Sequence, residues 1–153
     1  MHLRQAEPSD VEFLADVVIS VTRDQGRLPG DFDEVDFRTG FESWTAEHLA
    51  GTVEGNRTSV IEVDGERAGR LRVVRTGAVV ELAGIQLLPP FQSRGIGSEI
   101  LVLLKAEAAS SGASLELSVE IDNPRAQALY ERHGLVVTGT TGGERRLRWT
   151  PAG

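Results

Sequence analysis

The chain has 153 residues, of which 40% are hydrophobic and 25% charged, the usual balance for one globular domain, here 1–153, with its own core. The net charge of −7 makes nucleic acid a poor partner, and because no run of about eighteen apolar residues occurs, we expect no membrane span. The chain contains no cysteine, which excludes disulfides, thiolate metal ligands and a cysteine nucleophile.

The N-terminal region predicts a short strand followed by a helix. Residues 2–6 suit a strand, and the lack of an apolar signal core leads us to expect a cytoplasmic protein. Ser9 or Asp10 is the expected cap of the first helix, whose apolar residues recur at helical spacing. A glycine- and proline-containing stretch at 25–30 stops this helix.

The next region is strongly acidic. Residues 31–36 are predicted as a loop, and a second helix spans 38–49 and ends at Gly51. Residues 1–66 hold 15 acids and 5 Lys/Arg, a net −10, whereas residues 67–153 hold 8 acids and 11 Lys/Arg, a net +3. This division suggests two ligands of opposite charge, or else solvated surface charges scattered by chance.

The middle of the chain predicts an antiparallel meander. Three strands are expected at 58–64, 67–75 and 79–88. The dipeptide Asp64-Gly65 is a strong hairpin signal between the first two, and a short glycine-containing turn joins the second to the third.

The C-terminal half alternates helices and strands. A helix that begins after Gly95 and runs to about Ser110 precedes a strand at 114–120, so the strands before and after that helix are expected to be parallel. Asn123 caps a last helix that starts at Pro124 and ends at Gly134, and a hairpin of strands 135–141 and 144–149 closes the chain. The predicted order is β-α-α-β-β-β-α-β-α-β-β.

The segment Gln92-Ser93-Arg94-Gly95-Ile96-Gly97 joins a strand to a helix start. Free backbone N–H groups and the helix dipole suit a phosphate there, and glycine allows close approach. Neither the Gly-Lys-Ser/Thr of a phosphate loop nor the third glycine of a dinucleotide fingerprint is present. The alternative is a helix start whose glycines only permit a tight turn.

This segment resembles the acetyl-CoA signature of the GNAT N-acetyltransferase superfamily. The downstream segment from Asn123 to Leu135 is similar to that family's Asn-x-x-Ala-x-x-x-Tyr-x-x-x-Gly pattern. The resemblance implies an α/β (α+β) fold in which about four helices flank a mixed, mostly antiparallel sheet of six to seven strands. It also implies acetyl-CoA as co-substrate, an amine acceptor, no metal, and a relationship to proteins that often form homodimers.

Carried onto this sequence, the resemblance implies three groups of cofactor contacts. Strand residues pair through their backbone with the pantetheine arm, the turn cradles the pyrophosphate, and the last helix touches the arm. Arg94 is either a phosphate partner or a solvated arginine, and Asn123 either contacts the arm, caps its helix or does both. The implied contacts are Leu87, Leu88, Pro89, Gln92, Ser93, Arg94, Gly95, Ile96, Gly97, Ser98, Asn123, Ala126 and Tyr130.

The catalytic groups follow from the same resemblance. A backbone N–H of Ile85 or Leu87, at an expected bulge eased by Gly84, would polarise the thioester carbonyl. Tyr130 lies two helical turns after Asn123 on the same helix face and would protonate the departing thiolate, unless it is a core tyrosine.

Glu81 matches the general-base glutamate of histone-type relatives and lies in an otherwise apolar strand. It could instead face solvent or pair with Arg72. Glu120 and a water chain are the other candidate bases. His48 and His133 fit a base by chemistry but do not fit the motif.

The acceptor region is predicted less sharply. The resemblance places the amine near the first two helices, their connecting loop and the last hairpin, where acids and aromatic rings would suit an ammonium. These side chains could equally be core aromatics under a solvated loop, and a non-catalytic acyl-CoA-binding module or an interaction domain on the same fold stays open. The candidates are Asp31, Asp33, Glu34, Asp36, Phe37, Phe41 and Trp44.

Overall fold

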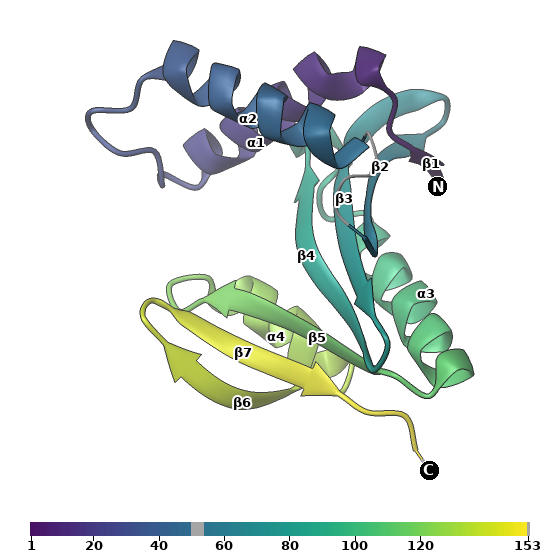
Figure 1. Cartoon of the computed structure of the whole chain (residues 1–153). Helices are drawn as coiled ribbons and strands as arrows, with labels where there is room; N and C mark the ends of the chain where they lie inside the picture. Colours follow the sequence, from purple (N-terminus) through teal and green to yellow (C-terminus); the bar gives the residue numbers. More distant parts are fainter. Residues whose placement is uncertain (50–53, 153) are drawn as a thin grey trace. The chain divides into compact units, whose positions relative to one another are not determined.

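The computed structural model describes residues 1–49 and 54–152, and their elements follow the predicted order (Figure 1). The strands of the described chain form a seven-stranded sheet in the order β1-β2-β3-β4-β5-β7-β6. β4 and β5 are parallel, as predicted from the helix between them, whereas the β1–β2, β5–β7 and β6–β7 pairs are antiparallel. The strands are β1 His2–Gln5, β2 Asn56–Val63, β3 Glu66–Thr76, β4 Val79–Leu87, β5 Ser114–Glu120, β6 Val136–Thr141 and β7 Glu144–Trp149. The helices are α1 Val11–Asp24, α2 Glu34–Leu49, α3 Ile96–Ser111 and α4 Pro124–Arg132.

The chain divides into two compact units. The first comprises Met1–Arg72 and Gly84–Arg94, and the second comprises Val73–Ala83 and Gly95–Gly153. In the first unit, α1 packs against α2. Buried Leu14 and Val60 form a core cluster with Ala6, and Phe41 and other half-buried side chains pack against it.

The start of α2 corrects one prediction. Residues 34–36 were expected in an acidic loop, but they form the first helical turn, because Asp33 caps the helix. The Asp36 N–H donates to Asp33 Oδ1 at 3.1 Å, and the Phe37 N–H donates to the Asp33 carbonyl at 3.0 Å. Acidic residues in a first turn also favour the positive end of the helix dipole. The predicted end of this helix at Gly51 lies outside the described residues.

Gly40 lies inside α2, and a Cβ built on it meets no atom within 4 Å. Replacing Gly40 with alanine therefore removes the entropic cost of a helical glycine without a clash. We expect Gly40→Ala to raise the free energy of unfolding by about 0.5–1 kcal/mol. Urea denaturation followed by circular dichroism measures this change, and a loss of stability would mean that this face of α2 is covered.

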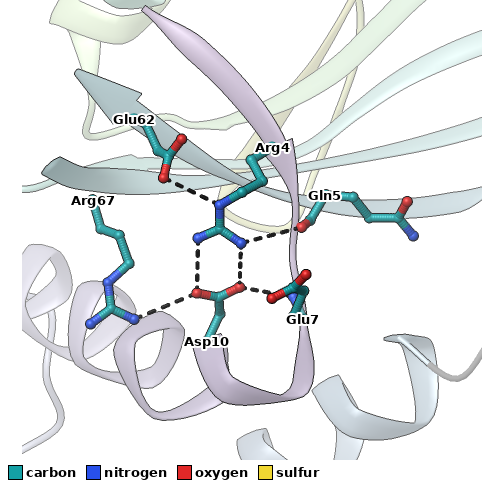
Figure 2. A network of polar contacts seen from close by, with 6 residues as sticks. All are labelled: Arg4, Gln5, Glu7, Asp10, Glu62 and Arg67. Atoms are coloured by element: carbon teal, nitrogen blue, oxygen red, sulfur yellow. Dashed lines mark hydrogen bonds and ion pairs between the residues drawn. The ribbon is translucent and has the colours of Figure 1, made fainter. Parts of the chain in front are cut away.

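A charged network joins β1 to the start of α1 (Figure 2). Asp10 is 3% exposed, and its carboxylate accepts from Arg4 Nη1 at 2.8 Å, Arg4 Nη2 at 3.0 Å and the Glu7 N–H at 2.8 Å. Arg4 Nε donates to Glu62 Oε2 on β2 at 3.2 Å, and Arg67 Nη1 lies 3.5 Å from Asp10. Asp10, one of the two predicted caps, thus fixes β1 and β2 to the first helix.

Asp10→Asn is expected to cost about 2–4 kcal/mol of stability, since it removes the charge that compensates a partly buried Arg4. The side-chain bond from Arg4 is the main cause that holds the pKa of Asp10 below its ordinary value, and it outweighs burial. A carboxylate with a depressed folded pKa stabilises the fold above its unfolded pKa, and this stabilisation is lost as the pH falls through the folded pKa. Stability curves between about pH 2 and 7 should therefore be shallower for Asp10→Asn than for the wild type; parallel curves would contradict this role.

In the second unit, α3 packs on β5. Alternation along β5 buries Leu115 and Leu117, and Leu117 is opposite the fully buried Leu147 of β7. Ile100 and Leu101 bring the apolar face of α3 into this core. No helix in the described part of the chain is long and apolar enough to cross a membrane.

Candidate active site

The turn that follows β4 is shaped by Pro89 and Pro90. These prolines cannot continue the strand and instead begin a short 3₁₀ turn, Pro89–Phe91, that buries Phe91. Gln92 Nε2 donates to the Leu87 carbonyl at 2.8 Å, so its side chain folds back onto the end of β4. The Arg94 guanidinium lies 5.4 Å from the centre of the Phe91 ring.

The helix α3 begins directly after Gly95. Gly95 has a φ of 79°, in the left-handed region that glycine adopts readily, and Ser93 has a φ of 60°. The Glu99 N–H donates to the Gly95 carbonyl at 3.0 Å, which is the first bond of the helix. The N–H groups of Ile96 and the residues beside it belong to the turn that has no intrahelical acceptor, as a phosphate site requires.

Within the second unit, the start of α3 lies against α4. A Cβ on Gly97 would lie 3.4 Å from Leu129 Cδ2, so glycine permits close packing of the two helices. Ser98 Oγ and His133 Nε2 are 2.8 Å apart, and Lys105 Nζ donates to the His133 carbonyl at 3.0 Å. His133, considered as a base from its chemistry, thus connects α3 and α4.

The helix α4 carries the second predicted motif. Asn123 Oδ1 accepts from the Ala126 N–H at 3.2 Å, so the predicted cap is formed. Ala126 and Tyr130 are one helical turn apart and share a face of α4. The structure therefore brings Gly97, Ser98 and the motif of α4 into one unit.

Tyr130 is partly buried, and burial raises the pKa of its phenol above the ordinary value. A phenol with a raised pKa keeps its proton at neutral pH and is available as a donor. The electrostatic setting of Tyr130 therefore suits an acid and not a base.

Glu81 lies in a group of charged side chains on the second unit. It is opposite Glu116 in the parallel β4–β5 pair, and Arg146 of β7 contacts both carboxylates, at 2.9 Å and 3.4 Å. Burial lowers the pKa of Arg146, but its bonds to Glu81 and Glu116 outweigh burial and raise the pKa above the ordinary value. Glu81 pairs with Arg146, whereas Arg72 donates to Asn56 Oδ1 at 2.8 Å.

The other candidate bases have different surroundings. Glu120 is exposed at the end of β5, opposite Glu144 of β7. His48 lies within α2, where its Nδ1 is 2.7 Å from the Trp44 carbonyl and its ring centroid is 3.8 Å from that of Trp44.

The end of β4 lies very close to β3 in the first unit. A Cβ on Gly69 would lie 2.2 Å from the Gln86 carbonyl oxygen, so only glycine fits there. The Leu88 N–H donates to the Ala68 carbonyl at 2.9 Å. These contacts hold the backbone that was predicted to pair with the pantetheine arm.

The aromatic residues predicted for the acceptor form a row along α2. The ring centroids of Phe37 and Phe41 are 5.6 Å apart, and those of Phe41 and Trp44 are 6.4 Å apart. However, the protein's own cations contact two of these rings: Arg70 lies 5.4 Å from the centre of Phe41, and Arg72 lies 4.8 Å from that of Trp44.

Two of the four candidate acids of this region also have partners. Glu34 is ion-paired with Arg23 at 3.2 Å and with Arg38 at 3.3 Å, and Asp33 caps α2. The sequence-based expectation that these rings and acids together hold an ammonium therefore receives no support from these contacts.

Sequence reasoning missed Arg70. This residue is 7% exposed, and its Nη1 donates to Gln86 Oε1 at 3.0 Å. In the sequence, Arg70 lies on the polar side of a strand in which polar and apolar residues alternate. That pattern ordinarily indicates a face exposed to solvent, so it did not predict a buried arginine. Here α2 covers that face, which only the tertiary structure shows.

Comparisons with known proteins agree with this fold. The family model described as "Acetyltransferase (GNAT) family" matches residues 22–135. The solved structure of the PaiA N-acetyltransferase from Thermoplasma acidophilum in complex with coenzyme A is similar, with a TM-score of 0.83 and 17% identity over 98% of each chain.

Two further similar structures have different acceptors in their names. A spermidine N-acetyltransferase SpeG chimera from Vibrio cholerae and hSSAT has a TM-score of 0.71 and 20% identity, covering 98% of this chain and 96% of its own. RimL, a ribosomal L7/L12 alpha-N-protein acetyltransferase in complex with coenzyme A, has a TM-score of 0.70 and 18% identity, covering 97% of this chain and 92% of its own.

Proposed function

The chain belongs to the acetyltransferase (GNAT) family, and we propose that it transfers the acetyl group of acetyl-CoA to a primary amine by direct attack in a ternary complex. The observation that carries the proposal is the α3 start packed on α4, which joins the phosphate-type helix terminus to Asn123 and Tyr130. Because the matched residues 22–135 run through both units, we treat the two units as one catalytic domain.

The proposed contacts with acetyl-CoA come from the end of β4, from the turn that follows it with the start of α3, and from the motif of α4. The backbone of the strand end would pair with the pantetheine arm, and the turn and first α3 residues would hold the pyrophosphate. Binding of the pantetheine arm to the end of β4 would replace the hydrogen bond from the Gln92 side chain to the Leu87 carbonyl. The residues concerned are Leu87, Leu88, Pro89, Gln92, Ser93, Arg94, Gly95, Ile96, Gly97, Ser98, Asn123, Ala126 and Tyr130.

In the proposed reaction, Glu81 takes one proton from the ammonium of the acceptor, directly or through water, and the neutral amine then attacks the thioester carbonyl carbon. A C–N bond forms, the C–S bond breaks, and the amine loses one proton. Tyr130 gives its phenolic proton to the departing thiolate, and the proton that the nitrogen loses returns to Tyr130 through water.

Glu81→Gln tests the base. We expect it to lower kcat/KM about 10- to 100-fold near pH 7 and less at about pH 9, where more of the amine is neutral without help. Glu120→Gln is the matched comparison, because Glu120 is the other candidate carboxylate. It should leave kcat/KM unchanged at both pH values, and a defect as large as that of Glu81→Gln would assign the base to Glu120 instead. A defect of equal size at both pH values would indicate a structural role for Glu81 in the pair with Arg146.

The proposed function is tested by thiol release from acetyl-CoA with a panel of primary amines, followed by mass spectrometry of the product. The panel contains a polyamine, standard L-amino acids, simple alkylamines and a peptide with a free N-terminus. We expect an N-acetylated product for at least one class. Binding of acetyl-CoA without amine-dependent thiol release would instead identify a non-catalytic acyl-CoA-binding module.

A further inference from the structure

Arg70 of β3 is a buried cation that the proposed reaction does not use. Its side chain crosses β4 at Gly84, where an added Cβ would lie 2.8 Å from Nη1, and lies over the ring of Phe41. Arg70 Nη1 donates a hydrogen bond to Gln86 Oε1, and Arg70 Nε has no hydrogen-bond partner among the residues that the structure describes. Within that part of the chain, no carboxylate pairs with this guanidinium.

An unpaired buried charge is costly, so it calls for a reason. Burial lowers the pKa of Arg70 to about 10, with a further contribution from the positive charge of Arg72. The group therefore remains protonated at neutral pH. Two neighbouring guanidinium groups form a local concentration of positive charge within a unit that is otherwise acidic.

Other buried polar atoms face the same layer. Asn56, Thr58 and Val60 occupy every second position of β2 and therefore share one face of the strand. Val60 packs in a cluster with Phe41 of α2, so this is the face that α2 covers. Thr45 lies one helical turn after Phe41. Asn56 Nδ2, Thr58 Oγ1 and Thr45 Oγ1 have no hydrogen-bond partner among the described residues, as is true of Arg70 Nε.

We propose that Arg70 binds a carboxylate of the acceptor, so that the substrate is an amine that also carries a carboxylic acid, such as a free amino acid. This inference rests on the proposed acetyl transfer and specifies its substrate class. A planar guanidinium matches the two oxygens of a carboxylate, and the buried Nε, which has no hydrogen-bond partner within the described residues, lies on the edge that would form that pair. The amide of Asn56 and the threonine hydroxyls supply further donors on the same face.

The test compares acceptors that differ only in the carboxylate. Thiol release is measured with L-amino acids, with the amines that lack their carboxylate, and with O-phosphoethanolamine as the phosphate arm. We expect the amino acids to have a kcat/KM about 10- to 100-fold above that of the matched amines, which is the factor that one hydrogen-bonded pair with a charged group usually contributes to binding. Equal rates for both members of each pair, or a preference for the phosphate, would overturn the proposal.

The variant Arg70→Met removes the charge and keeps most of the side-chain volume. We expect it to lose the discrimination between amino acid and amine, to keep the KM for acetyl-CoA, and to raise the melting temperature by a few degrees, since a buried unpaired charge is gone. Arg57→Met is the matched control, because Arg57 is exposed on the neighbouring strand β2. Retained discrimination in Arg70→Met would contradict the proposal.

A binding experiment that needs no turnover separates this inference from the proposed function. Thermal unfolding is measured with N-acetyl amino acids and with the corresponding N-alkylacetamides, neither of which requires turnover. Stabilisation of the wild type, but not of Arg70→Met, by the carboxylates alone would support the site even if no amine were acetylated. Equal effects of both ligand types on both proteins would refute the site even if acetyl transfer were observed.

Discussion

Replacing Tyr130 with phenylalanine is expected to lower kcat about 100-fold or more, while the Kd for acetyl-CoA changes less than about threefold. The phenyl ring keeps the apolar contacts of the partly buried side chain, so the change removes mainly the proton that would go to the thiolate. Burial already raises the pKa of this phenol, which keeps the proton in place at neutral pH. Steady-state kinetics and calorimetry on the same preparation separate the two effects.

Ser98→Ala also removes one hydroxyl from the α3–α4 contact, at the bond to His133. Because Ser98 is itself a proposed cofactor contact, this variant serves as a control for kcat alone. It should lower stability slightly and leave kcat within about threefold of the wild type. If Tyr130→Phe turned over at the wild-type rate, Tyr130 would be a packing residue and the thiolate would take its proton from water.

Replacing Gly69 with alanine is expected to cost about 1–3 kcal/mol of stability and to raise the KM for acetyl-CoA about tenfold or more. The added Cβ would lie 2.2 Å from the Gln86 carbonyl oxygen and 3.0 Å from Leu87 Cδ2. Because the first of these atoms is backbone, the end of β4 has to move. That segment is the one proposed to pair with the pantetheine arm.

Gly77→Ala is the matched control, since the same change in the β3–β4 turn meets no atom within 4 Å. It should change neither the KM for acetyl-CoA nor stability by more than about 0.5 kcal/mol. A Gly69→Ala variant that lost stability but kept its KM would show that the end of β4 is not part of the cofactor site.

The order of elements could be predicted from the sequence because its signals are local. The Asp64-Gly65 dipeptide marks a hairpin, the Asn123-Pro124 pair marks a helix start, and glycines end helices, and all of these depend on neighbouring residues alone. The start of α2 was missed for a related reason. Asp33 is a good cap, but the acids that follow it are equally typical of a loop.

The parts that could not be predicted depend on which elements cover one another. The polar side of β3 would normally face water, and only the position of α2 makes Arg70 a buried cation. The partner of Glu81 likewise comes from β7, whose Arg146 is 65 residues away in the chain. Pairs at such separation leave no local pattern in the sequence.

Calorimetric titration with acetyl-CoA and with CoA tests the central claim most directly. We expect one molecule of either ligand to bind per chain, and a ligand concentration of about 100 times Kd to raise the melting temperature by roughly 5–10 °C. If saturating acetyl-CoA produced neither heat nor protection from unfolding, the turn at Gln92–Gly97 would not be a cofactor site, and the proposed acetyl transfer would be wrong.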